Sequence, residues 1–76
     1  MVRIRFKKAS YKVRGLLGNP GRWRLERALM ALDGMEEVRV YPARGIVTLL
    51  FDPDRCHGED IRKAFKRAGH PNFTRT

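Results

Sequence analysis

The feature that most constrains this chain of 76 residues is the order of elements between Asn19 and Gly69. Apolar residues spaced three and four apart predict a helix over Arg22–Leu32. Two short runs with strand character follow, Glu37–Tyr41 and Ile46–Phe51, and a second helix is predicted over Glu59–Ala68. The central unit is therefore helix, strand, strand, helix, and the rest of the chain is placed relative to it.

Each predicted element has one apolar face. In the first helix this stripe comprises Leu25, Ala28, Leu29 and Leu32, and Trp23 extends it or covers its end. Asn19 or Gly21 is expected to cap this helix, Gly34 to end it, and Met35 to enter the core after the turn. Val38 and Val40 are predicted to point inward, with Arg39 and Tyr41 outward. The run Ile46–Phe51 is almost continuously apolar, which predicts a central strand.

The N-terminal segment contains two alternating patterns in succession. Val2, Ile4 and Phe6 alternate with Arg3, Arg5 and Lys7, which predicts a strand with the apolar side chains on the core. After Lys8 the apolar phase changes to Ala9, Tyr11 and Val13. The change of phase predicts either a bulge within one strand or a small extra hairpin near Lys8–Val13.

A last edge strand at His70–Phe73 completes the order β-α-β-β-α-β, in which proline is tolerated at the edge. This order predicts a single α+β domain over residues 1–76, a ferredoxin-like βαββαβ sandwich with a four-stranded antiparallel sheet and both helices on one face. Residues 7–18 form an enlarged strand 1 or loop region. The three cations Arg3, Arg5 and Lys7 are expected on the open face of the sheet, near Arg39, Tyr41 and Thr48.

Several segments together resemble the heavy-metal-associated domain family, over about residues 10–70. The resemblance is carried by Leu25-Glu26-Arg27-Ala28-Leu29, Leu32-Asp33-Gly34-Met35, Val38-Arg39-Val40, Gly45-Ile46-Val47, Phe51-Asp52-Pro53, Ile61-Arg62-Lys63-Ala64-Phe65 and Ala68-Gly69. Domains of this family are the small βαββαβ modules of copper chaperones and of the cytoplasmic ends of metal-transporting P-type ATPases. The resemblance implies the same fold and a role in metal homeostasis.

The family's metal motif, Gly-Met-Thr-Cys-x-x-Cys, matches Gly15–Gly21 here, so both cysteine positions are glycines, Gly18 and Gly21. Two thiolates in that motif bind soft Cu(I), whereas glycine offers no ligand. A second register resembles a cysteine-less subgroup from N-termini of P-type ATPases, with the Arg-rich strand Arg3–Phe6 and the loop end Gly18-Asn19-Pro20. In that register Lys7–Leu17 is an enlarged loop. The sequence leaves both registers open.

Other chemistry has little support in the sequence. The pair Cys56-His57 is the remaining candidate for weak transition-metal binding, but adjacent Cys and His side chains chelate a tetrahedral ion poorly. We predict a loop thiol beside a helix cap instead. The two histidines, His57 and His70, belong to no arguable nucleophile–base–orienter set, so we predict no catalytic residues, no enzyme activity and no cofactor.

The excess of positive charge fits either a solvated basic surface or an anionic partner. The chain has 17 Lys and Arg against 8 Asp and Glu, a net charge of +9. An acidic protein or a transporter domain is the predicted partner, and non-specific nucleic-acid binding is the alternative. The predicted binding surface comprises Arg3, Arg5, Lys7, Lys12, Arg14, Leu16, Leu17, Arg22, Trp23, Arg39 and Tyr41; Lys8 joins these cations in the nucleic-acid alternative.

Location and assembly follow from weaker signals. The sequence has one cysteine and no run of about 18 apolar residues, so we expect a reducing, cytoplasmic setting without membrane insertion, which includes the cytoplasmic face of a membrane transporter. A monomer or a weak homodimer is expected.

Overall fold

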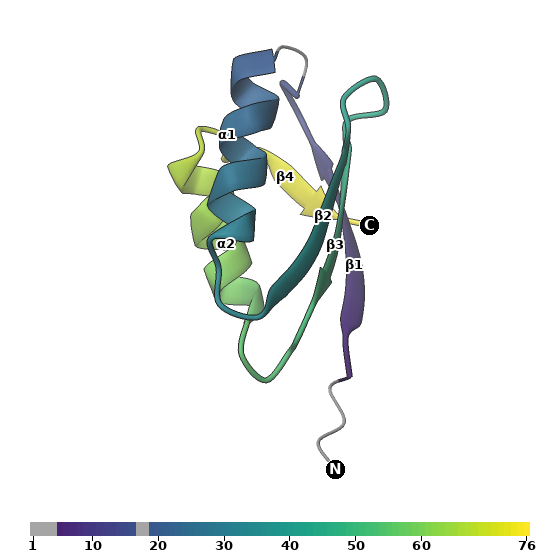
Figure 1. Cartoon of the computed structure of the whole chain (residues 1–76). Coiled ribbons are helices and arrows are strands. Elements are labelled where there is room, and N and C mark those ends of the chain that lie inside the picture. The colour runs from purple at the N-terminus through teal and green to yellow at the C-terminus, as the bar shows by residue number, and fades with distance from the viewer. Residues whose placement is uncertain (1–4, 17–18) are drawn as a thin grey trace.

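A computed structural model describes residues 5–16 and 19–76, and for residues 19–22 it describes the backbone alone. The elements follow the order β1, α1, β2, β3, α2, β4. Their bounds are Lys7–Val13, Asn19–Met30, Met35–Tyr41, Ile46–Phe51, Gly58–Arg67 and Phe73–Arg75. The four strands form one sheet in the order β2-β3-β1-β4, and every pairing is antiparallel. The two helices cover one face of this sheet (Figure 1), so the predicted ferredoxin-like class is confirmed.

The predicted central strand, Ile46–Phe51, is β3 with the same bounds, and it lies between β1 and β2. Val47 and Leu49 are fully buried and Phe51 nearly so, while the alternate residues are half-buried. The face that carries these three side chains is the face under the helices. The predicted phase of β2 is also confirmed, because Val40 is buried and Val38 packs against the core, whereas Arg39 and Tyr41 are exposed.

The first strand differs from the prediction. β1 begins at Lys7, so the structure uses the second alternating pattern, with Ala9, Tyr11 and Val13 buried. Phe6 lies before the strand with 43% of its surface exposed, so its predicted place in the core is wrong. Neither an enlarged loop nor an extra hairpin forms over residues 7–13, which are one continuous strand. Val2, Arg3 and Ile4 lie outside the described residues.

The helices form where predicted, with shifted ends. α1 begins three residues before the predicted start and ends at Met30. Leu25 and Leu29 are fully buried, and Ala28 and Leu32 pack against the core, so the predicted stripe is confirmed. Since the helix ends at Met30, Gly34 does not terminate it. Gly34 instead takes a φ of 85° in the turn that leads into β2, where Met35 is buried as predicted.

The far side of the core is aromatic. In α2, Phe65 is fully buried, and its ring lies 5.2 Å from that of Tyr11 and 4.7 Å from that of Phe73, between centroids. β4 begins at Phe73, three residues later than predicted, and pairs with β1 over residues 11–13. The residue predicted to begin that strand, His70, is instead buried at the end of α2, where its N–H donates to the carbonyl of Phe65 at 2.9 Å.

Candidate functional site

The outward residues of β1, β3 and β2 form three rows across the face of the sheet that the helices leave uncovered. Strand register places Lys8, Leu50 and Glu37 in the first row, Ser10, Thr48 and Arg39 in the second, and Lys12, Ile46 and Tyr41 in the third. We call these nine residues the open face. Side chains in such rows are direct neighbours, because Cβ atoms on opposed strands lie about 5 Å apart.

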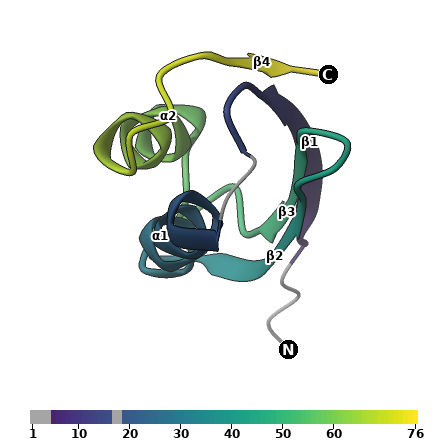
Figure 2. The ribbon, with the colours of Figure 1, turned by 90° about the horizontal axis from the view of Figure 1, so that it is seen from above.

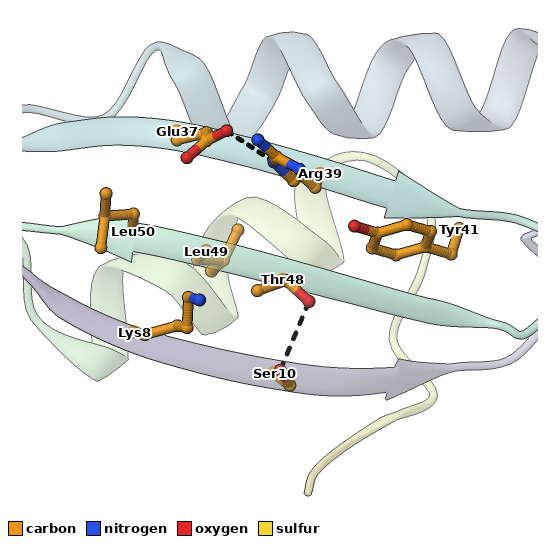
Figure 3. A pocket seen from close by; sticks show the side chains of 8 residues that line it. All are labelled: Lys8, Ser10, Glu37, Arg39, Tyr41, Thr48, Leu49 and Leu50. Carbon is orange, nitrogen blue, oxygen red and sulfur yellow. Dashed lines mark hydrogen bonds and ion pairs between the residues drawn. The ribbon is translucent and has the colours of Figure 1, made fainter.

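The middle of the open face is polar, and its charge is partly neutralised. The Arg39 Nε atom donates to Glu37 Oε1 at 2.6 Å, and this hydrogen bond is the main cause that raises the pKa of Arg39. The hydroxyls of Ser10 and Thr48 lie 3.4 Å apart. Together with Lys8, these residues line a shallow depression of about 430 Å³ (Figure 3). Lys8 therefore supplies the unpaired positive charge of this depression within the described residues.

The predicted binding surface needs three corrections. Arg5 precedes β1. Lys7 is the first residue of β1 and is exposed, but it lies on the side of the strand that carries Ala9 and Tyr11. Neither residue therefore lies on the open face. Because the strand uses the second alternating pattern, Lys8 and Lys12 lie on the open face where Arg5 and Lys7 were expected. Leu16 is 2% exposed and belongs to the core, so it is not a surface residue.

The other predicted residues are exposed, where the structure describes them. Lys12, Arg39 and Tyr41 lie on the open face, and Arg14 follows β1 directly. Trp23 lies on the surface of α1 with 59% of its area exposed, and the guanidinium carbon of Arg27 is 4.7 Å from its ring centroid. Leu17, Gly18 and the side chain of Arg22 lie outside the described residues.

Cys56 does not lie on the surface of its loop. It is fully buried, and its N–H donates to the carbonyl of Asp52 at 2.8 Å. Its neighbour His57 precedes α2, where the Asp60 carboxylate accepts a hydrogen bond from the His57 backbone N–H at 3.0 Å. The prediction of a loop thiol beside a helix cap is confirmed, and the structure adds that the thiol is buried in the core. Among the described residues, no group of three or more His, Cys, Asp or Glu side chains could hold a metal ion.

The loop between β1 and α1 is where the sequence resemblance places the family's metal motif. The structure favours the register in which Gly15–Gly21 matches that motif, because β1 ends at Val13 and α1 begins at Asn19. Gly15 takes a φ of 76° in the turn after the strand. The second register required an Arg-rich strand over Arg3–Phe6; Arg5 and Phe6 precede β1, and Arg3 and Ile4 lie outside the described residues. Gly18 lies outside the described residues, and Gly21 lies in the first turns of α1.

Solved structures of similar shape share the whole architecture. Oxidised MerP from Ralstonia metallidurans has a TM-score of 0.86 and 18% identity, over 95% of this chain and 99% of that chain. A copper binding domain from HMA7, a P-type ATPase, has a TM-score of 0.82 and 25% identity, over 91% and 92%. The apo N-terminal domain of ZntA has a TM-score of 0.82 and 21% identity, over 95% and 94%. The fold is that of the heavy-metal-associated domains.

The resemblance drawn from the sequence is thereby confirmed at the level of the fold. No protein-family model matches the chain, and no curated protein sequence matches it. In the part of the chain that the structure describes, neither helix is long and apolar enough to cross a membrane.

Sequence reasoning named Lys8 for the nucleic-acid alternative alone, and it missed Ser10 and Glu37, which complete the open face. The signal for Lys8 and Ser10 was present in the second alternating pattern, whose outward positions are 8, 10 and 12. The signal for Glu37 was also present, because it lies two residues before Arg39 and shares the alternation that places Arg39 and Tyr41 outward.

Proposed function

We propose that this chain is a non-catalytic interaction or regulatory module of the heavy-metal-associated type that works in metal homeostasis without binding the metal itself. Its setting is the cytoplasm, either beside a transporter or as one of its soluble domains. Its partner is an acidic protein or another part of the transporter. The fold shared with the metal-binding domains above supports the general setting, and the residues of this chain support the change of role.

The observation that carries this proposal is a retained fold without a retained ligand set. Both positions that match the family's thiols are glycines, Gly18 and Gly21. The one thiol, Cys56, is buried between β3 and α2, whereas the motif lies between β1 and α1 at the other end of the sheet. Burial raises the pKa of the Cys56 thiol, with a further rise from Asp60 and Asp33, so the thiolate that a soft metal needs is disfavoured.

The open face offers a partner two positively charged side chains, Lys8 in the first row and Lys12 in the third. Lys8 and Lys12 are both exposed on β1 and make no ion pair with another described residue. Exposed cations without a partner attract an anionic surface and raise the rate of association. An acidic protein surface meets this requirement.

Non-specific nucleic-acid binding is the second candidate, and the same cations favour it. Sheets of this topology that read RNA stack bases on rings of the two central strands. The outward residues of β1 and β3 include no ring, and Tyr41 lies on the edge strand β2. The open face therefore supports contact with phosphates better than recognition of bases.

Isothermal titration with Cu(I), Zn(II) and Co(II) tests the absence of metal binding. We expect no binding at micromolar affinity or tighter for the wild-type chain. The matched variant is Gly18→Cys with Gly21→Cys, which restores two thiols in the register that the structure favours and should bind Cu(I). Wild-type binding at micromolar affinity would overturn the proposal. If neither protein binds a metal, the match of Gly15–Gly21 to the metal motif is wrong, and the proposal itself stands.

Partner capture tests the surface. Wild-type chain and the variant Lys8→Glu with Lys12→Glu are used as bait, each with and without nuclease. Capture of an acidic protein that survives nuclease and is lost with the variant supports the proposal. Capture that disappears with nuclease favours the nucleic-acid candidate instead. Lys63→Glu on the outer side of α2 is the control, and it should capture the same protein as the wild type.

A further inference from the structure

A second depression lies at one corner of the sheet, where β1 ends beside β4 and the β2–β3 hairpin. Its volume is about 520 Å³, and its lining includes Lys12, Arg14, Asn72 and Thr74, with Gly45 at its margin. These residues come from three separate segments of the chain. Within the described residues, no acidic side chain lines it.

Backbone contacts hold this corner in place. The Val13 N–H donates to the Gly45 carbonyl at 2.7 Å, and the Arg14 N–H donates to the Asn72 carbonyl at 3.1 Å. Strand register pairs Lys12 with Thr74. The Cβ that any residue other than glycine would add at position 45 would lie 3.1 Å from the Val13 carbonyl oxygen, so the hairpin approaches β1 closely. The cations are thus carried by a rigid frame rather than by a free loop.

The donors at the corner match an oxyanion. Arg14 and Lys12 bring full positive charge, and the Asn72 amide and Thr74 hydroxyl can add neutral hydrogen bonds. Neither cation makes an ion pair with another described residue. The nearest acid on the open face, Glu37, is four residues away along β3, from the position opposite Leu50 to that opposite Ile46. That spacing is roughly 13 Å, which exceeds the screening length at physiological salt.

The remaining acids lie mostly at the other end of the molecule. They occupy the loop after α1, the start of β2, the loop after β3 and the start of α2, and they are Asp33, Glu36, Asp52, Asp54, Glu59 and Asp60. These loops and the corner lie at opposite ends of the sheet (Figure 1), and a view from above shows the corner beside the hairpin and β4 (Figure 2). The chain is therefore polarised, and its positive end is the end that carries the depression.

We propose that this corner is a carboxylate-binding site, into which an acidic segment of the protein partner inserts a Glu or Asp side chain between Arg14 and Lys12. The inference rests on the proposed function and specifies the chemical group of the partner that the basic surface binds. We choose a protein carboxylate because the proposed partner is acidic; a nucleic acid would gain phosphate contacts alone here, since no exposed ring lines the corner for a base to stack on. The ring of Phe73 is half-buried and stacked on Phe65.

Amide NMR titration with an acetylated hexaglutamate peptide tests the site. We expect saturable shifts centred on the amides of Arg14, Gly45, Asn72 and Thr74. Sodium chloride at matched ionic strength should move them less and without saturation. Arg14→Gln should weaken binding about 2- to 5-fold, and Arg14→Gln with Lys12→Gln about tenfold or more. Both side chains are exposed, so the variants should keep the spectral dispersion of the wild type.

The controls separate this inference from the proposed function. Lys63→Gln removes a cation from α2 and should leave the affinity unchanged. Shifts that sodium chloride reproduces, or shifts centred on α2, overturn the carboxylate site, while partner capture and metal titration still test the proposed function independently. A single-stranded oligothymidylate that binds this corner more tightly than the peptide would assign the site to phosphate and also overturn it.

Discussion

Replacement of Gly34 by alanine tests how closely the turn after α1 packs on the loop after β3. Gly34 has a φ of 85°, which alanine adopts at a cost. An added Cβ would lie 2.8 Å from the Cβ of Arg55 and 3.3 Å from both the Asp52 carbonyl oxygen and the Cys56 nitrogen. These are backbone and Cβ atoms of the turn after β3, so side-chain rotation cannot move them away. The Gly34 carbonyl also accepts the hydrogen bond from the Asp52 N–H, at 2.8 Å.

The expected loss is the sum of two costs. A left-handed conformation costs alanine about 1–2 kcal/mol relative to glycine. Relief of the contact requires the two segments to separate, which weakens the hydrogen bond between Asp52 and Gly34 and the packing around Cys56, at a further cost of about 1–2 kcal/mol. The total is roughly 2–4 kcal/mol, against a stability of about 4–11 kcal/mol for a domain of this size.

Urea unfolding followed by circular dichroism measures this loss against two matched variants. Gly69 has a φ of 86° and no atom within 4 Å of an added Cβ, so Gly69→Ala should show the conformational cost alone. Gly58 lies in α2 at an ordinary φ with open space around it, so Gly58→Ala should be neutral or stabilising by up to about 1 kcal/mol. If Gly34→Ala and Gly69→Ala lose the same free energy, the argument from close packing fails.

Two further predictions concern the core. Because burial raises the pKa of Cys56 above the ordinary value of 9.0, the unfolded chain loses the thiol proton first. The contribution of the Cys56 thiol to the free energy of unfolding should therefore be fully present below pH 9 and be lost as the pH rises above it. Urea titrations of Cys56→Ala should show a smaller decrease in the free energy of unfolding over the same pH range, and an equal decrease would contradict this prediction. Phe65→Ala removes the centre of the aromatic cluster and should cost about 3–5 kcal/mol in the same titration, whereas the exposed control Lys66→Ala should stay within about 0.5 kcal/mol.

The course of β1 shows where local pattern stops being informative. Both alternating patterns, Val2–Phe6 and Ala9–Val13, satisfy the same period, so each is an acceptable strand by itself. β3 has six residues and pairs with Lys7–Lys12, from Phe51 back to Ile46. Of the described residues before Lys7, neither Arg5 nor Phe6 pairs with β3. Pairing with β3 therefore determines that the second pattern forms β1, and the sequence of the first segment does not indicate this.

The candidate site inherits the same limit. Arg39 and Tyr41 were placed correctly, because the phase of β2 near its end depends only on the alternation with Val38 and Val40. Arg5 and Lys7 were placed wrongly, because a shift from one pattern to the next changes which residues face away from the helices. Likewise, Cys56 reads as a loop residue, and only the packing of the α1–β2 turn against its loop shows that it is buried.

The sequence alone determined the hydrophobic periodicity of the elements, with one apolar stripe in each helix and alternation in each strand, and it determined their order, βαββαβ. These features depend on contacts between residues that are close in the chain. The sequence also determined that no pair of thiols stands before the first helix. The tertiary structure decided which of two alternating patterns enters the sheet, which cations share the open face, and that Lys12, Arg14, Asn72 and Thr74 meet at one corner. Those outcomes depend on pairing between residues more than 30 positions apart, and the free energy of such pairing is not visible in any local stretch of sequence.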